Sequence, residues 1–288
     1  MSTLISIVML TWNGLNYTKE CVDSILRHAD KRIQIQFVFV DNGSTDGTVE
    51  YLRSVPSSKL ICNQVNRGFA AGNNQGLAVA DGEYICLLNN DTVVTKGWLT
   101  RLLSCLEQNP AIAIVGPRSN NVAWAQLVYN VPYKSMSEME AFAANWSQLN
   151  RDQGFFPHKL IGHCMLFHKD LITKIGGLDE RFFPGNYEDD DFCLRARVSG
   201  QILWVANDVY VHHYGGSTFK SNQTNYSASA FANAERFSRK WSLGMTGLEL
   251  DQFGYNPSEL VEREKPFRIE RHYVPIGGKV HEDCTDKS

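Results

Sequence analysis

A chain of 288 residues with 43% hydrophobic side chains can bury a full core, as one large α/β domain or two small ones. Its formal net charge of −3 argues against a nucleic-acid-binding surface, because phosphate backbones are bound mainly by clustered Lys and Arg. No apolar run approaches the roughly 18 residues of a membrane span, and the N-terminus lacks the basic region of a signal peptide. We therefore expect a cytoplasmic protein without a transmembrane segment, with peripheral contact at the inner face of the membrane left open.

The seven cysteines are odd in number, widely scattered and never arranged as CxxC. This pattern predicts reduced, mostly buried thiols rather than a disulfide framework or a zinc site.

The first ninety residues alternate strand and helix patterns, which is typical of βαβ units and a largely parallel sheet. The strands are apolar throughout, as expected when helices cover both faces of the sheet. Gly68, Gly72 and Gly76 fall every four residues, which indicates close packing of a helix. Strands are predicted at 4–10, 35–40, 59–62 and 84–88, and helices at 17–27 and 48–53.

Beyond Gly116 the sequence is rich in aromatic and polar residues, and we expect mostly loops up to Phe156. Regular structure is predicted to return at 160–168, with a helix beginning near Asp189 and a strand at 202–205. The polar C-terminal tail is predicted to be mobile. The predicted organisation is a nucleotide-binding half at 1–118, an acceptor-binding and catalytic half at 119–245, and a partly flexible extension at 246–288.

Polar residues follow three of the predicted strands, where open α/β sheets bind their ligands. Thr11 and Asn13 follow the first strand, Asp41 follows the second, and the sequence Asn89 to Asp91 follows the fourth. The first turn has neither the GxGxxG pattern nor a P-loop lysine, so a divalent metal is the natural bridge to a bound diphosphate. Asp91 is the best candidate ligand, with a turn residue or helix cap as the alternative.

Four consecutive acids, Glu188 to Asp191, stand between an aromatic loop and an apolar helix that ends at Gly200. The positive end of a helix dipole favours ionised carboxylates at that position. The pattern suits a general base at the mouth of a pocket, and helix capping is the alternative.

His212 and His213 end a further strand, directly before two glycines. Taken alone, such a pair is typical of structural histidines. Together with Asp91, one imidazole would complete a site for a metal such as Mn²⁺.

Six segments in this order resemble the family 2 glycosyltransferases, which have a GT-A fold, and in particular rhamnosyltransferase-like bacterial enzymes of surface polysaccharide biosynthesis. The resemblance implies an α/β, Rossmann-like, mixed and mostly parallel sheet flanked by helices, within a single compact domain. It extends over residues 4 to 243. The segments are SIVMLTWNG from Ser6, VDNGSTDGT from Val40, NRGFAAGNNQG from Asn66, LLNNDTVV from Leu87, GNYEDDDFCLRARVSG from Gly185 and VHHYGGSTF from Val211.

The resemblance also implies roles for individual residues. Asp91 would bind Mn²⁺ or Mg²⁺, with His213 favoured over His212 beside it. Asn89 replaces the first carboxylate of the DxD motif, which weakens the expected charge of the site. The donor pocket would be formed by Thr11, Asn13 and Asp41, which reads the base, and by Arg67, Asn73, Asn74 and Asn90 near the ribose, diphosphate or sugar.

Asp189 would be the catalytic base, with Glu188 beside it, whereas Asp191 would be structural and pair with Arg195. The implied reaction is a single displacement with inversion, from a UDP-sugar or dTDP-sugar to a hydroxyl of a glycan, a lipid-linked glycan or a protein. The alternatives are a nucleotidyltransferase and a non-catalytic protein that binds nucleotide sugars. The sequence does not indicate the oligomeric state.

Overall fold

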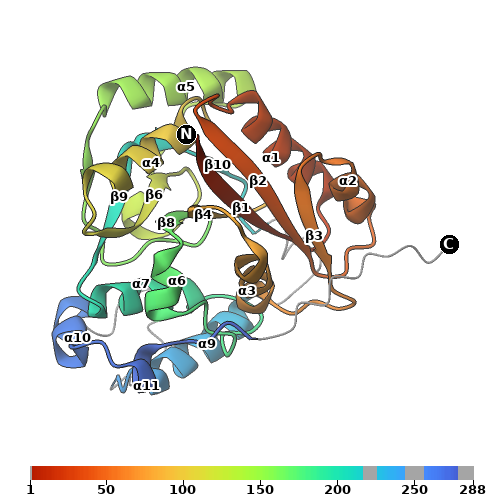
Figure 1. Ribbon diagram of the computed structural model, residues 1–288. Coiled ribbons are helices and arrows are strands. Elements are labelled where there is room, and N and C mark those ends of the chain that lie inside the picture. Colours follow the sequence, from red (N-terminus) through yellow and green to blue (C-terminus); the bar gives the residue numbers. More distant parts are fainter. Residues whose placement is uncertain (1, 217–225, 244–255, 278–288) are drawn as a thin grey trace.

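The computed structural model describes residues 2–216, 226–243 and 256–277 (Figure 1). Its strands are β1 Thr3–Thr11, β2 Ile33–Asp41, β3 Ser58–Cys62, β4 Tyr84–Leu88, β5 Thr92–Val93, β6 Ile112–Arg118, β7 Gly154–Phe155, β8 Cys164–His168, β9 Ile202–Tyr210 and β10 His212–His213. Its helices are α1 Leu15–Arg27, α2 Thr48–Ser54, α3 Phe69–Val79, α4 Trp98–Gln108, the 3₁₀ helix η1 Trp124–Gln126, α5 Met136–Leu149, α6 Asp170–Ile175, α7 Glu188–Val198, α9 Tyr226–Lys240, α10 Pro257–Glu264 and α11 Ile269–His272.

The main sheet has eight strands in the order β3-β2-β1-β4-β8-β6-β9-β7 among the described residues. β1 runs parallel to both β2 and β4, and β6 runs parallel to β9. β8 is antiparallel to its neighbours β4 and β6, and β7 is antiparallel to β9. The expected mixed, mostly parallel sheet is therefore confirmed.

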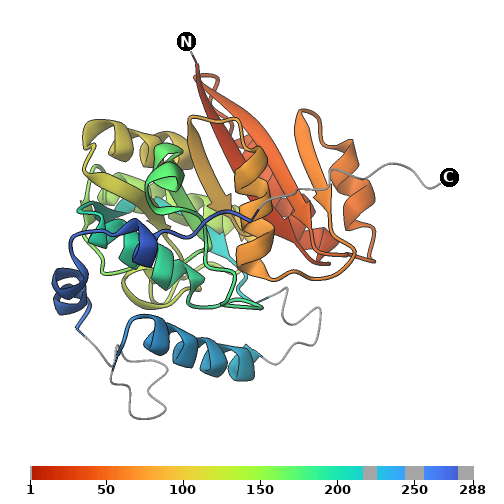
Figure 2. The ribbon, with the colours of Figure 1, turned by 60° about the horizontal axis from the view of Figure 1, so that its bottom comes forward.

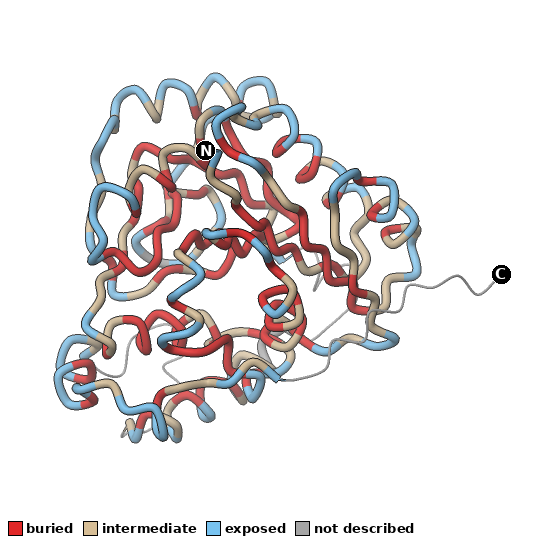
Figure 3. Tube along the Cα trace, viewed as in Figure 1, coloured by how far each residue is buried: buried red, intermediate tan, exposed pale blue. Residues whose placement is uncertain are grey.

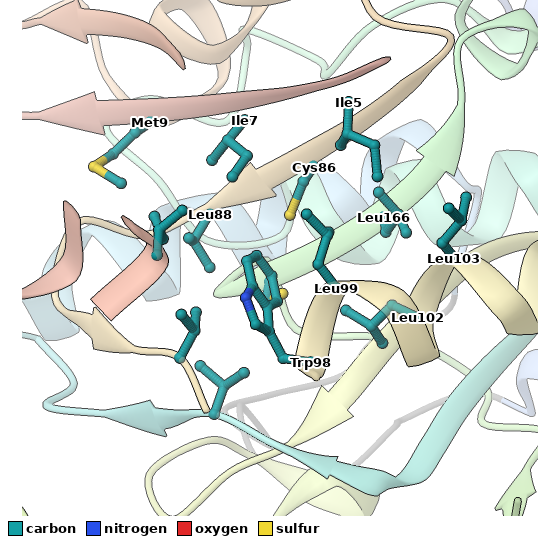
Figure 4. Packing of buried hydrophobic residues seen from close by; sticks show 14 of the residues in the cluster. Ile5, Ile7, Met9, Cys86, Leu88, Trp98, Leu99, Leu102, Leu103 and Leu166 are labelled. Atoms are coloured by element: carbon teal, nitrogen blue, oxygen red, sulfur yellow. The ribbon is translucent and has the colours of Figure 1, made fainter. Parts of the chain in front are cut away.

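Helices cover both faces of the sheet, and the strand sequences follow from that burial. Ile5, Ile7 and Met9 of β1 point to one face, where they share a core with α1 and α4 (Figure 4). Val8, between two of them, points to the other face, where α3, α6 and α7 pack. Figure 3 shows the resulting buried centre beneath exposed helix surfaces.

The elements predicted for the first ninety residues are all present in the structure. The glycine spacing has the predicted cause, because Gly72 and Gly76 let α3 lie directly on the sheet. A Cβ on Gly72 would come within 2.3 Å of Leu10 Cδ1, and one on Gly76 within 2.4 Å of Val8 Cγ1.

The prediction of loops between Gly116 and Phe156 was wrong for α5. This helix begins with a capping box, in which the Ser135 hydroxyl accepts the backbone N–H of Glu138 at 3.3 Å. The Glu138 carboxylate in turn accepts the backbone N–H of Lys134 at 2.7 Å. Phe142 and Trp146 of α5 pack against Tyr210 of β9 in one cluster. Trp146 also donates from its indole to the carbonyl of Asn207 at 2.7 Å.

Part of the predicted C-terminal extension is ordered. α9, α10 and α11 gather beside α7 on one side of the molecule (Figure 2). Leu260 and Val261 of α10 are buried in one cluster with Phe237 and Trp241. The polar tail that was predicted to be mobile lies outside the described residues.

Among the described residues, the cysteines agree with the prediction except at one position. Cys21, Cys86, Cys105, Cys164 and Cys193 are free thiols, and all but Cys105 are buried. Cys62 is disulfide-bonded, which corrects the expectation of a reduced thiol there.

Candidate functional site

The carboxyl ends of β1 and β2 form one wall of the candidate site. Asp41 is buried and accepts the Thr11 hydroxyl at 2.8 Å and the backbone N–H groups of Gly43 and Ser44 at 3.0 and 2.8 Å. Asn13 has a positive φ of 58° and accepts the N–H of Thr45 at 2.8 Å. These residues therefore fix the turn that follows β2. The carboxylate of Asp41 is held by the hydroxyl and backbone N–H groups named above.

The NRG segment before α3 forms a second part of the wall. Arg67 is exposed, and Asn73 is buried with its amide donating to Phe69 O at 2.9 Å. Asn74 points elsewhere: its amide nitrogen donates to Leu178 O at 2.8 Å and to Glu180 at 2.9 Å. Asn74 thus ties α3 to the loop after α6, which does not support its predicted contact with a donor.

Asn90 is also turned away from the pocket predicted for it. Its side chain is buried and donates to the Thr18 hydroxyl of α1 at 2.9 Å. Asn90 therefore joins the end of β4 to α1.

Asp91 and His213 are brought together by the small β5–β10 ribbon, in which His213 pairs with Thr92. The His213 Nε2 lies 3.1 Å from Asp91 Oδ1, and its Nδ1 contacts Asn121 O at 2.7 Å. Burial lowers the pKa of His213, but the adjacent Asp91 carboxylate raises it and prevails. The side chain of His213 therefore faces Asp91.

His212 points to the opposite side of the ribbon. Its Nδ1 contacts the Tyr133 hydroxyl at 2.7 Å, and that hydroxyl also meets the Tyr210 hydroxyl. Burial, followed by the charge of His213, lowers the pKa of His212 to about 4. His212 is therefore neutral and fixed by Tyr133, on the side of the ribbon away from Asp91.

His163 is a member of this cluster that the sequence did not suggest. It is buried, its ring stacks on His213 at 5.4 Å, and its Nδ1 contacts Ile161 O at 3.2 Å. Burial, then the charge of His213, lowers its pKa to about 3, so the ring stays neutral. The Nε2 atoms of His163 and His212 are buried without a hydrogen bond.

The four acids are at the start of α7, as predicted, but they differ in exposure. Glu188, Asp190 and Asp191 are buried, whereas Asp189 is partly exposed. Asp189 Oδ2 accepts the backbone N–H of Gly162 at 2.9 Å, and its Oδ1 accepts the N–H of Asp190 at 2.9 Å. Asp189 is therefore both fixed in position and accessible.

Burial and the charge of Asp190 raise the pKa of Asp189 to about 6. At pH 7 its carboxylate is still mostly ionised and can accept a proton. Burial and the charge of Asp189 raise the pKa of Glu188 well above its usual range, and Glu188 Oε2 has no hydrogen bond. The two neighbouring acids are thus unequal, and Asp189 is the better base.

Asp191 is structural, as predicted. Its carboxylate and the Arg195 guanidinium are both fully buried and pair at 2.7 Å. It also accepts the indole N–H of Trp241, the residue directly after α9, at 3.0 Å. This pairing anchors the helix that carries Asp189.

Two adjacent residues join the carboxylate Asp189 to the Asp91 cluster. Gly162 donates to Asp189, and the carbonyl of His163 accepts the N–H of Asn89 at 2.9 Å, two residues before Asp91. β8 enters the sheet here by its amino end, since it is antiparallel to β4. A search confined to the carboxyl ends of parallel strands misses these residues for that reason.

The loop before α7 is also fixed from both sides. Pro184 O accepts the N–H of Phe69 at 2.8 Å, and Gly185 O accepts the side-chain amide of Asn233 in α9 at 2.8 Å. This loop links the donor-side helix α3 to α9.

Comparison with known proteins places this arrangement among sugar-transferring enzymes. The family model described as Glycosyl transferase family 2 matches residues 6–176, more than half of the chain. The glycosyltransferase GlyG of Streptococcus pneumoniae is 33% identical over 120 residues, which cover 40% of this chain and 39% of GlyG. Across eight such curated relatives the chain spans between 27% and 46% of the relative's length.

Solved structures show the same fold at low sequence identity. The mannosyltransferase PcManGT from Pyrobaculum calidifontis, in complex with GDP-Man and Mn²⁺, is 16% identical with a TM-score of 0.59. The match covers 93% of this chain and 70% of that one. GalNAc-T7 with UDP, GalNAc and Mn²⁺ is 15% identical with a TM-score of 0.60, covering 96% of this chain and 55% of that one. The expected GT-A fold is therefore confirmed.

Proposed function

The chain belongs to glycosyl transferase family 2, and on that premise we propose that it moves a sugar from a nucleoside diphosphate to an acceptor hydroxyl. The observation that carries this proposal is the carboxylate of Asp189. It is the partly exposed member of the acid run in α7, and the N–H of Gly162 fixes it from the segment that also contacts the Asp91 cluster.

Asp189 acts as the general base in this proposal. It takes the proton from the acceptor hydroxyl while that oxygen attacks the anomeric carbon and the bond to the diphosphate breaks. One base and one displacement give inversion. The raised pKa of Glu188 keeps more of this side chain protonated and so unable to accept a proton, and Glu188 is assigned to the pocket wall.

The family implies a divalent metal, and two side chains of this chain suit one. The donors are the Asp91 carboxylate and the buried Nε2 of His213, and Mn²⁺ accepts both kinds of ligand. No group of three or more His, Cys, Asp or Glu side chains in the described ranges is arranged to hold a metal. The protein would thus supply two ligands, and diphosphate and water the others. When bound, Mn²⁺ or Mg²⁺ stabilises the charge on the leaving diphosphate.

For the donor we propose a UDP-sugar or dTDP-sugar, bound along the wall that Thr11, Asn13 and Asp41 form. The support is the shared fold with GalNAc-T7, whose structure contains UDP and Mn²⁺. The rhamnosyltransferase-like specificity rests on the sequence resemblance alone. Arg67 is exposed at the same edge and is available to a phosphate or sugar oxygen.

For the acceptor we propose a hydroxyl of a glycan, a lipid-linked glycan or a protein. Phe183 is 51% exposed on the loop that leads into α7, where an aromatic face can stack on a sugar ring. No helix among the described residues has the length and apolar character needed to cross a membrane.

The test is release of nucleoside diphosphate from a panel of nucleotide sugars with Mn²⁺ and candidate acceptors. We expect Asp189→Asn to lower kcat by about 10²-fold or more, the usual contribution of a general base, with donor binding retained. Donor binding is measured by thermal stabilisation with the nucleotide.

Asp170→Asn is the matched control, because Asp170 also lies in the first turn of a helix but its side chain is 87% exposed. It should leave kcat unchanged. If Asp189→Asn transferred sugar at the rate of the original chain while remaining folded, the assignment of the base would be wrong.

A further inference from the structure

Lys159 lies beside the start of α7 and has no role in the reaction proposed above. Its ammonium group is 2.6 Å from Asp190 Oδ1, and the two side chains are only 15% and 9% exposed. Ion pairs on the surface contribute little to stability, whereas a buried pair such as this one strongly affects the charges around it.

The segment that carries Lys159 is held by side chains from other elements. The backbone N–H of Leu160 is donated to Cys193 Sγ at 3.3 Å and that of Ile161 to Gln126 Oε1 at 2.7 Å. The next N–H, from Gly162, is donated to Asp189. One short segment therefore contacts Asp189 through its backbone and Asp190 through a side chain.

The two carboxylates are adjacent in sequence and partly buried together. Without a cation, two such charges would repel each other, and one would take up a proton. In this structure Asp190 raises the pKa of Asp189, and Lys159 lowers it. Burial lowers the pKa of Lys159, but Asp190 and Asp189 raise it and prevail, so the ammonium group remains charged.

The other titratable groups near Asp189 do not replace this cation. Glu188 is an acid with a raised pKa. Cys193 is neutral, because burial raises the pKa of its thiol. Tyr187 precedes the run as the N-cap of α7 and offers no cationic group.

We propose that Lys159 is a positioning residue for the catalytic base: it neutralises Asp190 and thereby keeps Asp189 ionised and directed toward the acceptor hydroxyl. This inference rests on the proposed function, because it assigns Lys159 a role in that reaction. Lys159 acts through Asp190 and does not itself contact the substrate.

The experiment compares the pH dependence of kcat/KM in four proteins: the original chain, Lys159→Met, Asp190→Asn and the double variant. With the pKa of Asp189 at about 6, kcat/KM of the original chain should fall below pH 6. Lys159→Met leaves the charge of Asp190 uncompensated, so the acidic limb of the kcat/KM profile of this variant should move up by about one pH unit. Asp190→Asn removes a negative charge beside Asp189 and should move the acidic limb to lower pH. The double variant, which lacks both charges, should return to within about 0.3 unit of the original.

Two further variants separate charge from packing. Lys159→Arg keeps the cation and should restore most of the original pH profile. Lys59→Met removes the cation of another Lys–Asp pair, in which Lys59 of β3 lies 2.8 Å from Asp81, and should not move the acidic limb. If Lys159→Met left the limb in place, or if the double variant shifted as far as Lys159→Met, the proposal would be overturned.

A second measurement reads the carboxyl group of Asp189 directly. With ¹³C-labelled aspartate, the signal absent from Asp189→Asn reports this titration without any turnover. If no donor releases a diphosphate, the proposed function fails, while this titration still decides the coupling to Lys159. If Lys159→Met does not fold, the downward shift in Asp190→Asn tests the same charge pair from the other side, and its absence would count against the proposal.

Discussion

Asp91 and Asn89 show how much one charge matters at the proposed metal site. Asp91 is buried beside His213, whereas Asn89 stands where a second carboxylate would be expected. We expect Asp91→Asn to weaken Mn²⁺ binding in the presence of UDP by at least about tenfold. Asn89→Asp should strengthen it, because an additional carboxylate favours a hard divalent cation.

Isothermal titration or electron paramagnetic resonance of Mn²⁺ measures this affinity. Asp81→Asn, in the exposed pair with Lys59, controls for a general loss of negative charge. An unchanged Mn²⁺ affinity in Asp91→Asn would remove Asp91 from the metal site.

At the scale of residues, the sequence predicted the position of side chains that follow a strand or begin a helix. Asp91 follows β4 and Asp189 is in the first turn of α7, as expected, while their roles stay predictions. It did not predict the protein partners of Asn74 and Asn90, because a side-chain amide can hydrogen-bond to a neighbouring helix or loop as readily as to a ligand. Lys159 was not singled out, since its partner Asp190 is 31 residues away and only the tertiary fold joins them.

At the scale of elements, α7 holds the base in place through its buried ion pair. Asp191→Asn removes one partner of Arg195, whose charge would remain fully buried. We expect a loss of about 3 kcal/mol in the free energy of unfolding, measured by urea denaturation.

Glu235→Gln is the matched comparison, because it breaks an i,i+4 ion pair with Arg239 on α9 whose side chains are 54% and 75% exposed. Its effect should stay below about 0.5 kcal/mol. Equal losses in the two variants would mean that burial of the Asp191–Arg195 pair is irrelevant to α7.

The elements that the sequence predicted well are those with strong local patterns. The apolar strands and the glycine-spaced helix of the first ninety residues are examples. α5 was missed because only Met139 and Ala143 are buried in it, so its apolar periodicity is weak, although the Ser135 and Glu138 capping box was readable. The antiparallel direction of β8 depends on pairing with distant strands, which no local pattern encodes.

At the scale of the whole molecule, the C-terminal helices pack directly on α7 and on the turn after α6. Leu260 of α10 is 3% exposed, and it shares a cluster with Leu194 of α7 and Trp241. The backbone of Val274 also accepts the N–H of Gly177 at 2.8 Å, directly after α6. α10 and α11 are therefore expected to unfold together with the sheet.

Leu260→Ala tests this cooperativity, with an expected loss of about 2–5 kcal/mol in the free energy of unfolding. Hydrogen exchange under mild denaturant should show the amides of β1 and of α9 losing protection together. Ile269→Ala is the control, because Ile269 of α11 is 71% exposed, and it should change stability by less than about 0.5 kcal/mol. If α9 and α10 lost protection while β1 kept it, the C-terminal helices would be a separate folding unit. Their packing could then not hold α7, and with it Asp189, in place.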